Sequence, residues 1–579
     1  MSYLRLLAIG TVSLLMVAAC GKSEDAVEVA IEKTDSTLFD YVPADTPYLA
    51  GNLQPIPDDV IEVFLQRFEP VLASVQDELA KARQTLENED GSRLISAILQ
   101  EFDGNLSRQG MESLGFDLRA HKVVYGMGVF PVIRIGLSDA DALRATIQRV
   151  LANAEIDAPE LEHQGVSYWR LSDVDTADAP VGIYVSIFAD HLAMSIFPPL
   201  AETELLPAFL GLEMPGDSNA VSRLAELNAK HSYTPYGSGI LDLDQIVEEF
   251  ISPDTIMARV MATTGDFDPA DMTAECKTEI RGIVSNSPRM TMGVRELTTS
   301  AIAIQYRVET ETTLAQQLAG LVAEIPIANP LSDRLLEFSF GMRFGAVRDF
   351  LREKVVAIME SPYQCEHLQS INQSATEAFT QLNQPMPPLV NNFRGLRLSL
   401  SEITETNSMP VNGRGLIAVH IDQPEMFVGM AQMFLPDLSE LTLAPGEPPV
   451  QLPASMLPIP NVVAFAALST DTIGLSIGDG EEAGLPAYLE EEAGPAGTFM
   501  SIGYDMAAYF EYTQKLGKQY EQTEDELAET DPEQEAVLQS IEDISAAAQQ
   551  AVKSFSDRSY TTFRLTPDGF EADSRMTFK

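Results

Sequence analysis

The chain has 579 residues, of which 86 are acidic and 37 basic, so its formal net charge at pH 7 is −49. Such a charge repels phosphate groups, which excludes nucleic acid as a partner and excludes electrostatic docking on anionic lipid. The length exceeds the roughly 250 to 300 residues at which single cores stop growing, so we expect two or more domains.

The first segment is a short apolar run that ends at a cysteine. Arg5 precedes the run Leu6–Val17, and two alanines then lead into Cys20. About a dozen apolar residues are too few to span a ~30 Å hydrocarbon core, and small residues before the break suit a signal peptidase. The segment resembles the lipobox signal of bacterial lipoproteins. That resemblance implies that residues 1–19 are removed and that Cys20 carries lipid.

The residues after Cys20 predict a location and a tether. In the lipoprotein sorting rule that this signal resembles, Gly21 and Lys22 in place of an aspartate favour export to the outer membrane. No second apolar segment is long enough to cross a bilayer, so we expect a body held by lipid and facing the periplasm. Residues 20–42 are expected to be the lipidated cysteine and a flexible tether, because they are rich in small and charged residues.

The ordered body is expected to begin at Pro43, with its elements following in a recognisable order. Apolar spacing predicts helices from about residue 57 to 86 and over 93–102, and alternation predicts the strands. Asp139 or Asp141 is placed near the N-cap of a further helix. The remaining predicted elements are strands at 48–53, 123–128, 132–135, 166–171, 182–188 and 192–197, and helices at 139–156 and 202–210.

The second half of the sequence repeats this order. Residues 190–196 match 471–477, residues 206–210 match 485–489, and residues 240–244 match 501–505. Strand pairs close both halves, at 290–295 with 301–308 and at 561–565 with 570–578, and a strand followed by a helix reopens the order at 336–344 and 346–358. Several matches in one order indicate an ancient duplication. We therefore predict an α+β fold of two tandem duplicated modules, 43–310 and 333–579, joined by a linker at 311–332. Each module is expected to have a mainly antiparallel sheet with helices packed on one face.

Two cysteines remain after Cys20 is assigned to lipid. Cys276 and Cys365 in an exported chain suggest one disulfide, because the compartment is oxidising. A bridge across 89 positions stabilises by about 4.5 kcal/mol in the chain-entropy model. It would join the last helix of the first module to an early helix of the second. Two buried free thiols are the alternative.

Four patterns that suggest chemistry fail a test of spacing or of local structure. Residues 474–478 read GLSIG, which fits the GxSxG pattern of serine hydrolases, but Ile473, Leu475 and Ile477 alternate as in a strand that runs through the motif. The last histidine, His420, precedes Ser476, so a serine esterase using Ser476 is kept only as an alternative. The histidines and acidic clusters lack the spacing of zinc or calcium sites, and the GxG formed by Gly126 and Gly128 lacks a third glycine. We therefore predict no metal and no cofactor.

Apolar content in the second half leaves a ligand site open. Residues 426–435 are rich in Met, Phe and Leu, and the proline-rich residues 441–460 predict an extended loop. The loop either covers a groove between sheet and helices, or presents a partner surface, or is a stiff surface loop after a core helix. Residues 533–552 predict a helix with one apolar stripe, formed by Val537, Ile541, Ile544 and Ala548.

These observations predict a lipid-anchored cell-envelope protein of non-catalytic binding or scaffolding type. The alternative is a periplasmic carrier of a lipid or another apolar ligand. The PADTP opening at 43–47, the strand and helix order, and Gly165 with Val166 resemble a family of exported bacterial proteins. That resemblance implies export and no particular activity. The expected partners are the membrane, through the N-terminal lipid, and an envelope protein or an apolar ligand.

Overall fold

A computed structural model describes residues 34 and 36–579, except 87–89, 172–180, 265–267, 331, 405–411, 435–437, 439–440, 458–461, 511–549 and 551. The predicted signal segment, Cys20 and most of the predicted tether therefore lie outside the described residues. Nearly all of the helix predicted at 533–552 also lies outside them. Within the described ranges, the chain is a mixture of helices and antiparallel strands, so the predicted α+β class is confirmed.

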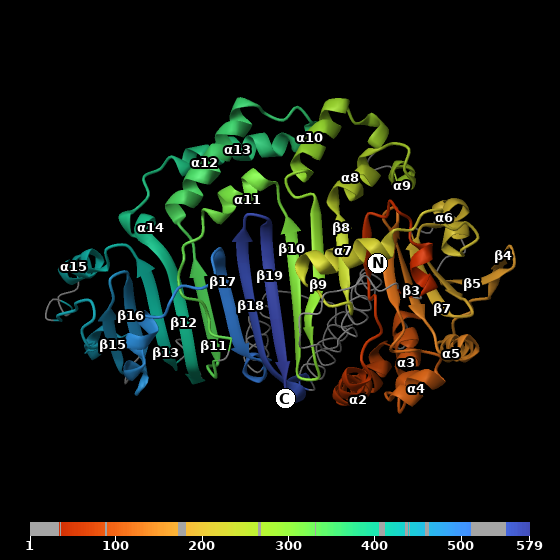
Figure 1. Ribbon diagram of the computed structural model, residues 1–579, viewed down its shortest axis with the longest axis horizontal. Helices are drawn as coiled ribbons and strands as arrows, with labels where there is room; N and C mark the ends of the chain where they lie inside the picture. The colour runs from red at the N-terminus through yellow and green to blue at the C-terminus, as the bar shows by residue number, and fades with distance from the viewer. Residues whose placement is uncertain are drawn as a thin grey trace.

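Nineteen described strands form one antiparallel sheet that runs across the width of the molecule (Figure 1). From one edge to the other, the pairings give the order β14, β15, β16, β13, β12, β11, β17, β18, β19, β10, β9, β8, β1, β2, β3, β7, β6, β5, β4. The strands are β1 (Tyr48–Gly51), β2 (Lys122–Met127), β3 (Phe130–Gly136), β4 (Leu161–His163), β5 (Val166–Leu171), β6 (Gly182–Ile187), β7 (His191–Phe197), β8 (Ser238–Asp242), β9 (Arg289–Leu297), β10 (Ala301–Glu309), β11 (Leu336–Gly341), β12 (Phe393–Thr404), β13 (Asn412–Ile421), β14 (Val450–Gln451), β15 (Ala464–Leu468), β16 (Thr472–Ile477), β17 (Thr498–Asp505), β18 (Ser556–Thr566) and β19 (Gly569–Phe578).

The two halves of the sheet place their strands in the same order. From the outside inward, the first half runs β6, β7, β3, β2, β1, β8, β9, β10, and the second runs β15, β16, β13, β12, β11, β17, β18, β19. The last strands of the halves, β10 and β19, pair with each other over nine residue pairs. The halves therefore share one continuous sheet, where the sequence predicted a sheet in each module.

Described helices pack on both faces of the sheet in the first half, which corrects the prediction of one covered face. Leu205 and Leu224, from α6 and α7, share a core with Tyr125 on one face. Leu143 of α5 packs against Val185 on the other face, where α2 also packs. Alternate residues of a strand point to opposite faces, and both faces of β2, β3, β6 and β7 are apolar enough to be covered. The helices of this half are α2 (Asp58–Leu86), α3 (Asp90–Phe102), α4 (Arg108–Ser113), α5 (Ala140–Asn153), α6 (Glu202–Phe209), α7 (Ala220–His231), α8 (Leu243–Ile251), α9 (Ile256–Thr264) and α10 (Ala274–Val284).

The second half is less densely covered by described helices. Its helix α12 has no buried residue, and α12 packs mainly with α13 and α14 above the sheet (Figure 1). A small core joins α16 to β13, β15 and β16. The helices are α11 (Thr312–Ala319), α12 (Phe344–Glu360), α13 (Gln369–Leu382), α14 (Pro388–Asn392), α15 (Pro424–Phe434) and α16 (Leu485–Leu489).

Parts of the two segments that the sequence assigned to a tether and to a linker are packed. The turn η1 (Thr37–Tyr41) buries Leu38 and Phe39 in the first core, so the tether expected through residue 42 ends earlier. In the predicted linker, α11 is followed by a buried stretch at 321–328 that contacts Gly341 and Gly395. The strand glycine Gly341 leaves room for segment 321–328, because a Cβ there would lie 2.6 Å from Ala323 O. Beside η1, a Cβ on Gly211 would lie 2.6 Å from the ring of Tyr41.

The proline-rich segment predicted as an extended loop runs along one edge of the sheet. Leu452 N–H donates to Ala464 O over 2.8 Å, and Gly446 N–H donates to Leu468 O over 3.1 Å. The segment thus occupies hydrogen-bonding groups of β15 and adds only the two-residue strand β14. At the opposite end, β4 has three residues. Short edge strands and prolines limit pairing of a sheet edge with other chains.

One buried arginine in each half occupies a comparable position. Arg134 of β3 donates to Phe209 O over 2.7 Å, and Arg397 of β12 donates to Tyr488 O over 2.8 Å. Phe209 and Tyr488 are equivalent in the matched segments 206–210 and 485–489. Each guanidinium also lies within 4 Å of an aromatic ring centroid, that of Tyr41 or of Tyr488. Each arginine therefore satisfies the end of a short helix from the sheet beneath it.

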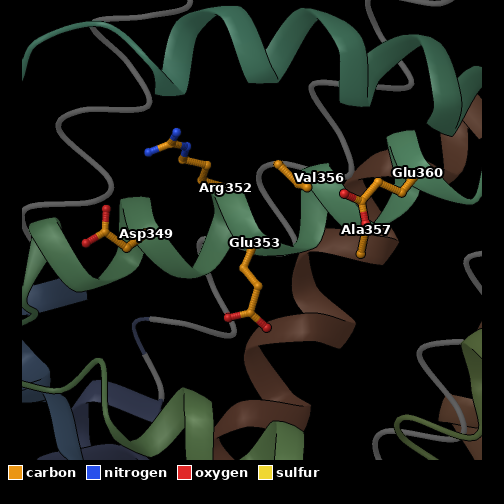
Figure 2. A pocket seen from close by; sticks show the side chains of 6 residues that line it. All are labelled: Asp349, Arg352, Glu353, Val356, Ala357 and Glu360. Carbon is orange, nitrogen blue, oxygen red and sulfur yellow. The ribbon is translucent and has the colours of Figure 1, made fainter.

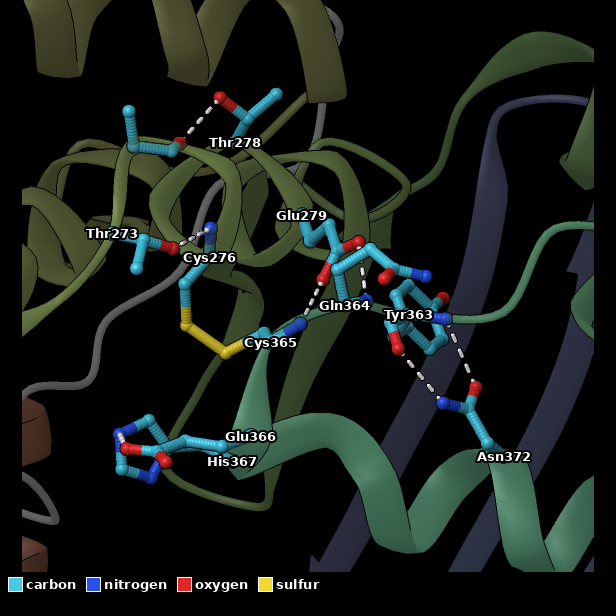
Figure 3. The surroundings of a disulfide bond; sticks show 11 residues. Thr273, Cys276, Thr278, Glu279, Tyr363, Gln364, Cys365, Glu366, His367 and Asn372 are labelled. Atoms are coloured by element: carbon cyan, nitrogen blue, oxygen red, sulfur yellow. Dashed lines mark hydrogen bonds and ion pairs between the residues drawn. A yellow bond between two sulfur atoms is a disulfide. The ribbon is translucent and has the colours of Figure 1, made fainter.

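The predicted disulfide between Cys276 and Cys365 is confirmed (Figure 3). The sulfur atoms are bonded at 1.86 Å, and the bond joins α10 of the first half to the residue before η4 (Glu366–Leu368) of the second. Glu279 of α10 accepts the backbone N–H groups of Gln364 and Cys365 over 2.8 and 2.9 Å. Hydrogen bonds from Glu279 thus join the same two segments beside the disulfide.

Replacing both cysteines by serine, Cys276→Ser with Cys365→Ser, is expected to lower the free energy of unfolding by about 4.5 kcal/mol, because the unfolded chain regains the entropy of an 89-residue loop. Urea unfolding followed by circular dichroism measures the loss. Dithiothreitol should shift the wild-type transition similarly and leave the double variant unchanged. Two reactive thiols in the unreduced, denatured wild type would contradict the prediction.

Candidate binding surface

The sheet in the second half carries its polar residues on a buried face. Alternate positions of β11, β12 and β17 bear Ser339, Ser399 and Ser501, each at most 3% exposed. The Ser339 and Ser501 hydroxyls are 2.7 Å apart, and Ser501 Oγ accepts the N–H of Ala328 in the crossing segment 321–328. Small side chains here let that segment lie close to the sheet and satisfy its backbone groups.

The opposite face of the same strands is apolar and only half-buried, and we call it the apolar face. Its residues alternate with the buried serines and glycines along five adjacent strands, which span roughly 20 Å at the usual strand spacing. None of its twelve side chains belongs to the buried core. They are Leu336, Phe338, Phe340, Leu396, Leu398, Leu400, Ile417, Val419, Ile473, Leu475, Met500 and Ile502.

Aromatic side chains bound this face at both ends of its strands. At one end the Phe344 ring of α12 lies with its centroid 6.4 Å from that of Phe340 and 5.5 Å from that of Phe393. At the other end Tyr504, which pairs with Leu336, stacks against Tyr509 with ring centroids 4.6 Å apart. A surface of half-buried apolar side chains with polar residues buried behind it is the reverse of ordinary burial, and apolar patches of this kind mark binding sites.

The apolar face can bind aliphatic groups but offers no reactive group to them. Its residues are Leu, Ile, Val, Phe and Met, which have no ionisable group and no strong hydrogen-bonding group. The contact it offers is therefore hydrophobic burial, with shape set by the sheet twist.

Ser476 lies where its strand pattern predicts, in the middle of β16 on the buried face. Its side chain is 0% exposed, and its hydroxyl has no hydrogen-bond partner among the described residues. His420 pairs with Thr472, four residues from Ser476 along β16, which is about 13 Å at the usual rise. This geometry lacks the strand-to-helix turn and the neighbouring base that a hydrolase serine requires. We do not pursue the serine esterase alternative.

His420 is a buried, neutral histidine on the same face as Ser476. Its Nδ1 lies 3.0 Å from the Thr472 hydroxyl, while its Nε2 has no hydrogen-bond partner among the described residues. Burial, together with the nearby Arg397, lowers the pKa of His420 to about 4. Protonating His420 in the folded protein is therefore unfavourable.

A hollow of about 560 Å³ lies along one side of α12 (Figure 2). The described residues that line it are mostly charged and follow each other at helical spacing: Asp349, Arg352, Glu353, Val356, Ala357 and Glu360. Neighbouring acids and bases on an exposed helix are an ordinary solvated face. Across the described residues, no three His, Cys, Asp or Glu side chains gather as metal ligands would. None of the described helices combines the length and apolar character needed to cross a bilayer.

The sequence analysis did not identify the apolar face, although a signal was present. Residues 396–400 read Leu, Arg, Leu, Ser, Leu, which is the period of a half-buried strand, and residues 416–419 are a short continuous apolar run, which is consistent with a strand. We did not assign β12 and β13 from the sequence. These patterns would have located the strands, but only the packing of segment 321–328 shows that their polar side is the buried one.

Comparisons of the chain with protein-family models, with curated proteins and with solved structures give no match.

Replacing His420 by asparagine is expected to reduce the loss of stability at acid pH. Between about pH 6.5 and 4 the unfolded chain binds a proton at His420 that the folded protein does not, so this histidine lowers stability as pH falls. As the pH falls through that window, the free energy of unfolding of the wild type should decrease by roughly 1.4 kcal/mol per pH unit more than that of the His420→Asn variant. Urea titrations at several pH values measure this. The exposed His367, replaced by asparagine, serves as control, and equal slopes for all three proteins would refute the assignment.

Proposed function

We propose that this protein is a lipid-anchored cell-envelope protein of non-catalytic binding type, and that its apolar face binds the aliphatic part of a lipid or another apolar ligand. The single observation that carries the proposal is the row of twelve half-buried apolar side chains on five adjacent strands, backed by buried serines. Leaving such a surface in water is unfavourable by about 25 cal/mol for each Å² that a ligand would cover.

Two further observations support the proposed location. The signal at Leu6–Val17 and Cys20 resembles that of bacterial lipoproteins, and the Cys276–Cys365 bond suits an oxidising compartment. Gly21 and Lys22 favour the outer membrane, with the body facing the periplasm. A lipid anchor would hold the apolar face close to a source of apolar ligands.

We also infer that the two halves arose by duplication. Both place eight strands in one order, and the matched segments 190–196 and 471–477 fall on the corresponding strands β7 and β16. The segments 206–210 and 485–489 fall on α6 and α16, beside equivalent arginine contacts. Duplication accounts for this agreement because chance matches of short apolar strings need not share a place in the fold. The apolar face belongs to the second half alone, so the halves would have diverged in function.

A charge placed in the apolar face should weaken apolar binding. We expect Leu398→Asp to raise the Kd for the uncharged fluorescent probe N-phenyl-1-naphthylamine about tenfold, because the ligand would have to desolvate a carboxylate. The matched control is the same substitution, Leu200→Asp, at a side chain in the first half that is 52% exposed. Probe titrations on proteins with unchanged circular dichroism test this. Equal affinities for the wild type and both variants would exclude the apolar face as the binding site.

Replacing Cys20 by serine should abolish lipid anchoring without changing the body. Since lipidation adds about 0.8 kcal/mol of membrane affinity per buried CH₂, the wild type should enter the detergent-rich phase of Triton X-114 and Cys20→Ser should remain in the aqueous phase. Mass spectrometry of the mature N-terminus is the second measurement. An unmodified Cys20, or a chain that still begins at residue 1, would contradict the proposed anchor.

A further inference from the structure

The helix α15 exposes large apolar side chains at the end of the sheet farthest from the N-terminus (Figure 1). Met426, Met430, Met433 and Phe434 are 39, 38, 75 and 78% exposed. Their spacing of i, i+4, i+7 and i+8 places them within about 100° of one another around the helix axis, while Phe427, in the first turn, is buried. We call these four side chains the α15 surface.

The corresponding helix of the first half shows that this exposure is not required by the fold. Helix α5 follows β3 as α15 follows β13, and both bury a large apolar residue toward the body. The exposed positions of α5 bear Asp141, Ala145, Gln148, Arg149, Ala152 and Asn153. At the equivalent place, α15 presents methionines and a phenylalanine. The α15 surface is therefore a property of this helix, and its type is typical of adaptable protein-binding surfaces.

The charge around the α15 surface selects the kind of partner. Residues 415–514 contain fourteen Asp and Glu residues and no Lys or Arg. This stretch includes α15, β15, β16, α16, β17 and β13 from Gly415 onward. Arginines in or beside neighbouring strands pair with Asp422, Glu481 and Glu491, and the other acidic residues leave this end of the molecule with an excess of negative charge. Helices that lie on membranes usually have Lys and Arg on their polar side, and a second copy of this chain would bring the same acidic surroundings. Both occupants are disfavoured.

We propose that the α15 surface docks into an apolar groove, rimmed by Lys and Arg, on a different protein. The four apolar side chains would fill the groove in the manner of an amphipathic helix, and the acidic surroundings would pair with the basic rim. This docking is independent of the apolar face, because its residues lie on a helix and not on the strands that form that face.

Site-specific photocrosslinking tests this docking in full-length protein from cells that naturally produce the chain. The crosslinker p-benzoylphenylalanine replaces Phe434, and in a control it replaces the exposed Gln148 of α5. Envelope preparations are irradiated at low salt and at about 0.5 M NaCl, where the Debye length falls to roughly 4 Å. The expected result is one crosslinked protein from position 434 and none from 148. Its crosslinked peptide should have apolar residues flanked by Lys or Arg.

Two further readouts separate a specific groove from general stickiness. The yield should fall about fivefold or more at high salt, because the charged rim is screened, whereas a purely hydrophobic contact would not weaken. Met430→Glu should also abolish the crosslink, and Met433→Gln should reduce it, with the urea midpoints of both unchanged because these side chains are exposed. Crosslinks to phospholipid, crosslinks to a second copy of the chain, salt-insensitive crosslinks, or none at position 434 would each overturn the proposal.

Discussion

The pairing of β10 with β19 is the interaction on which the rest of the architecture depends. Nine residue pairs join the last strand of each half, and Gln305 Nε2 donates to Asp573 Oδ1 over 2.8 Å at the centre of the ladder. Arg307 pairs with Glu571 beside it at 2.6 Å. The junction pairs the edges of β10 and β19 with each other. Among the described strands, the edges of the sheet are therefore the short β4 at one end and β14 with the proline-rich segment at the other. A single rigid sheet is the result.

The disulfide is a second link between the two halves, and it lies outside the sheet. Cys276 and Cys365 tie α10 to the segment before α13, so the helices above the sheet are linked across the junction as the strands are within it. Two separate links between the same halves resist rotation of one half against the other, because a hinge at either link would strain the other. The apolar face therefore belongs to a stiff sheet, which suits a surface that binds by shape and burial.

The two halves have the same strand order but differ in how the faces of the sheet are covered. In the first half, helices such as α5, α6 and α7 cover both faces, and apolar residues such as Tyr125 and Val185 are buried on each. In the second half, segment 321–328 and α16 pack on the side that bears serines and glycines, so the leucines of β12 stay half-buried on the other side. The same contrast separates the polar exterior of α5 from the α15 surface. Both surfaces that we propose for binding thus lie in the second half.

The sequence by itself determined the local elements and several pairings of segments. Period-two alternation located β7, β9, β10 and β16, the Asp139 cap located the start of α5, and the count of cysteines predicted the bond between Cys276 and Cys365. These signals depend on neighbouring residues or on the number of cysteines, so they can be read from one sequence. Only the tertiary structure decided that the halves share one sheet, that residues 37–42 and 321–328 are packed, and which face of β11 and β12 is buried. An alternating strand has the same pattern whichever face is covered, and the choice depends on segments that are distant in sequence but adjacent in space.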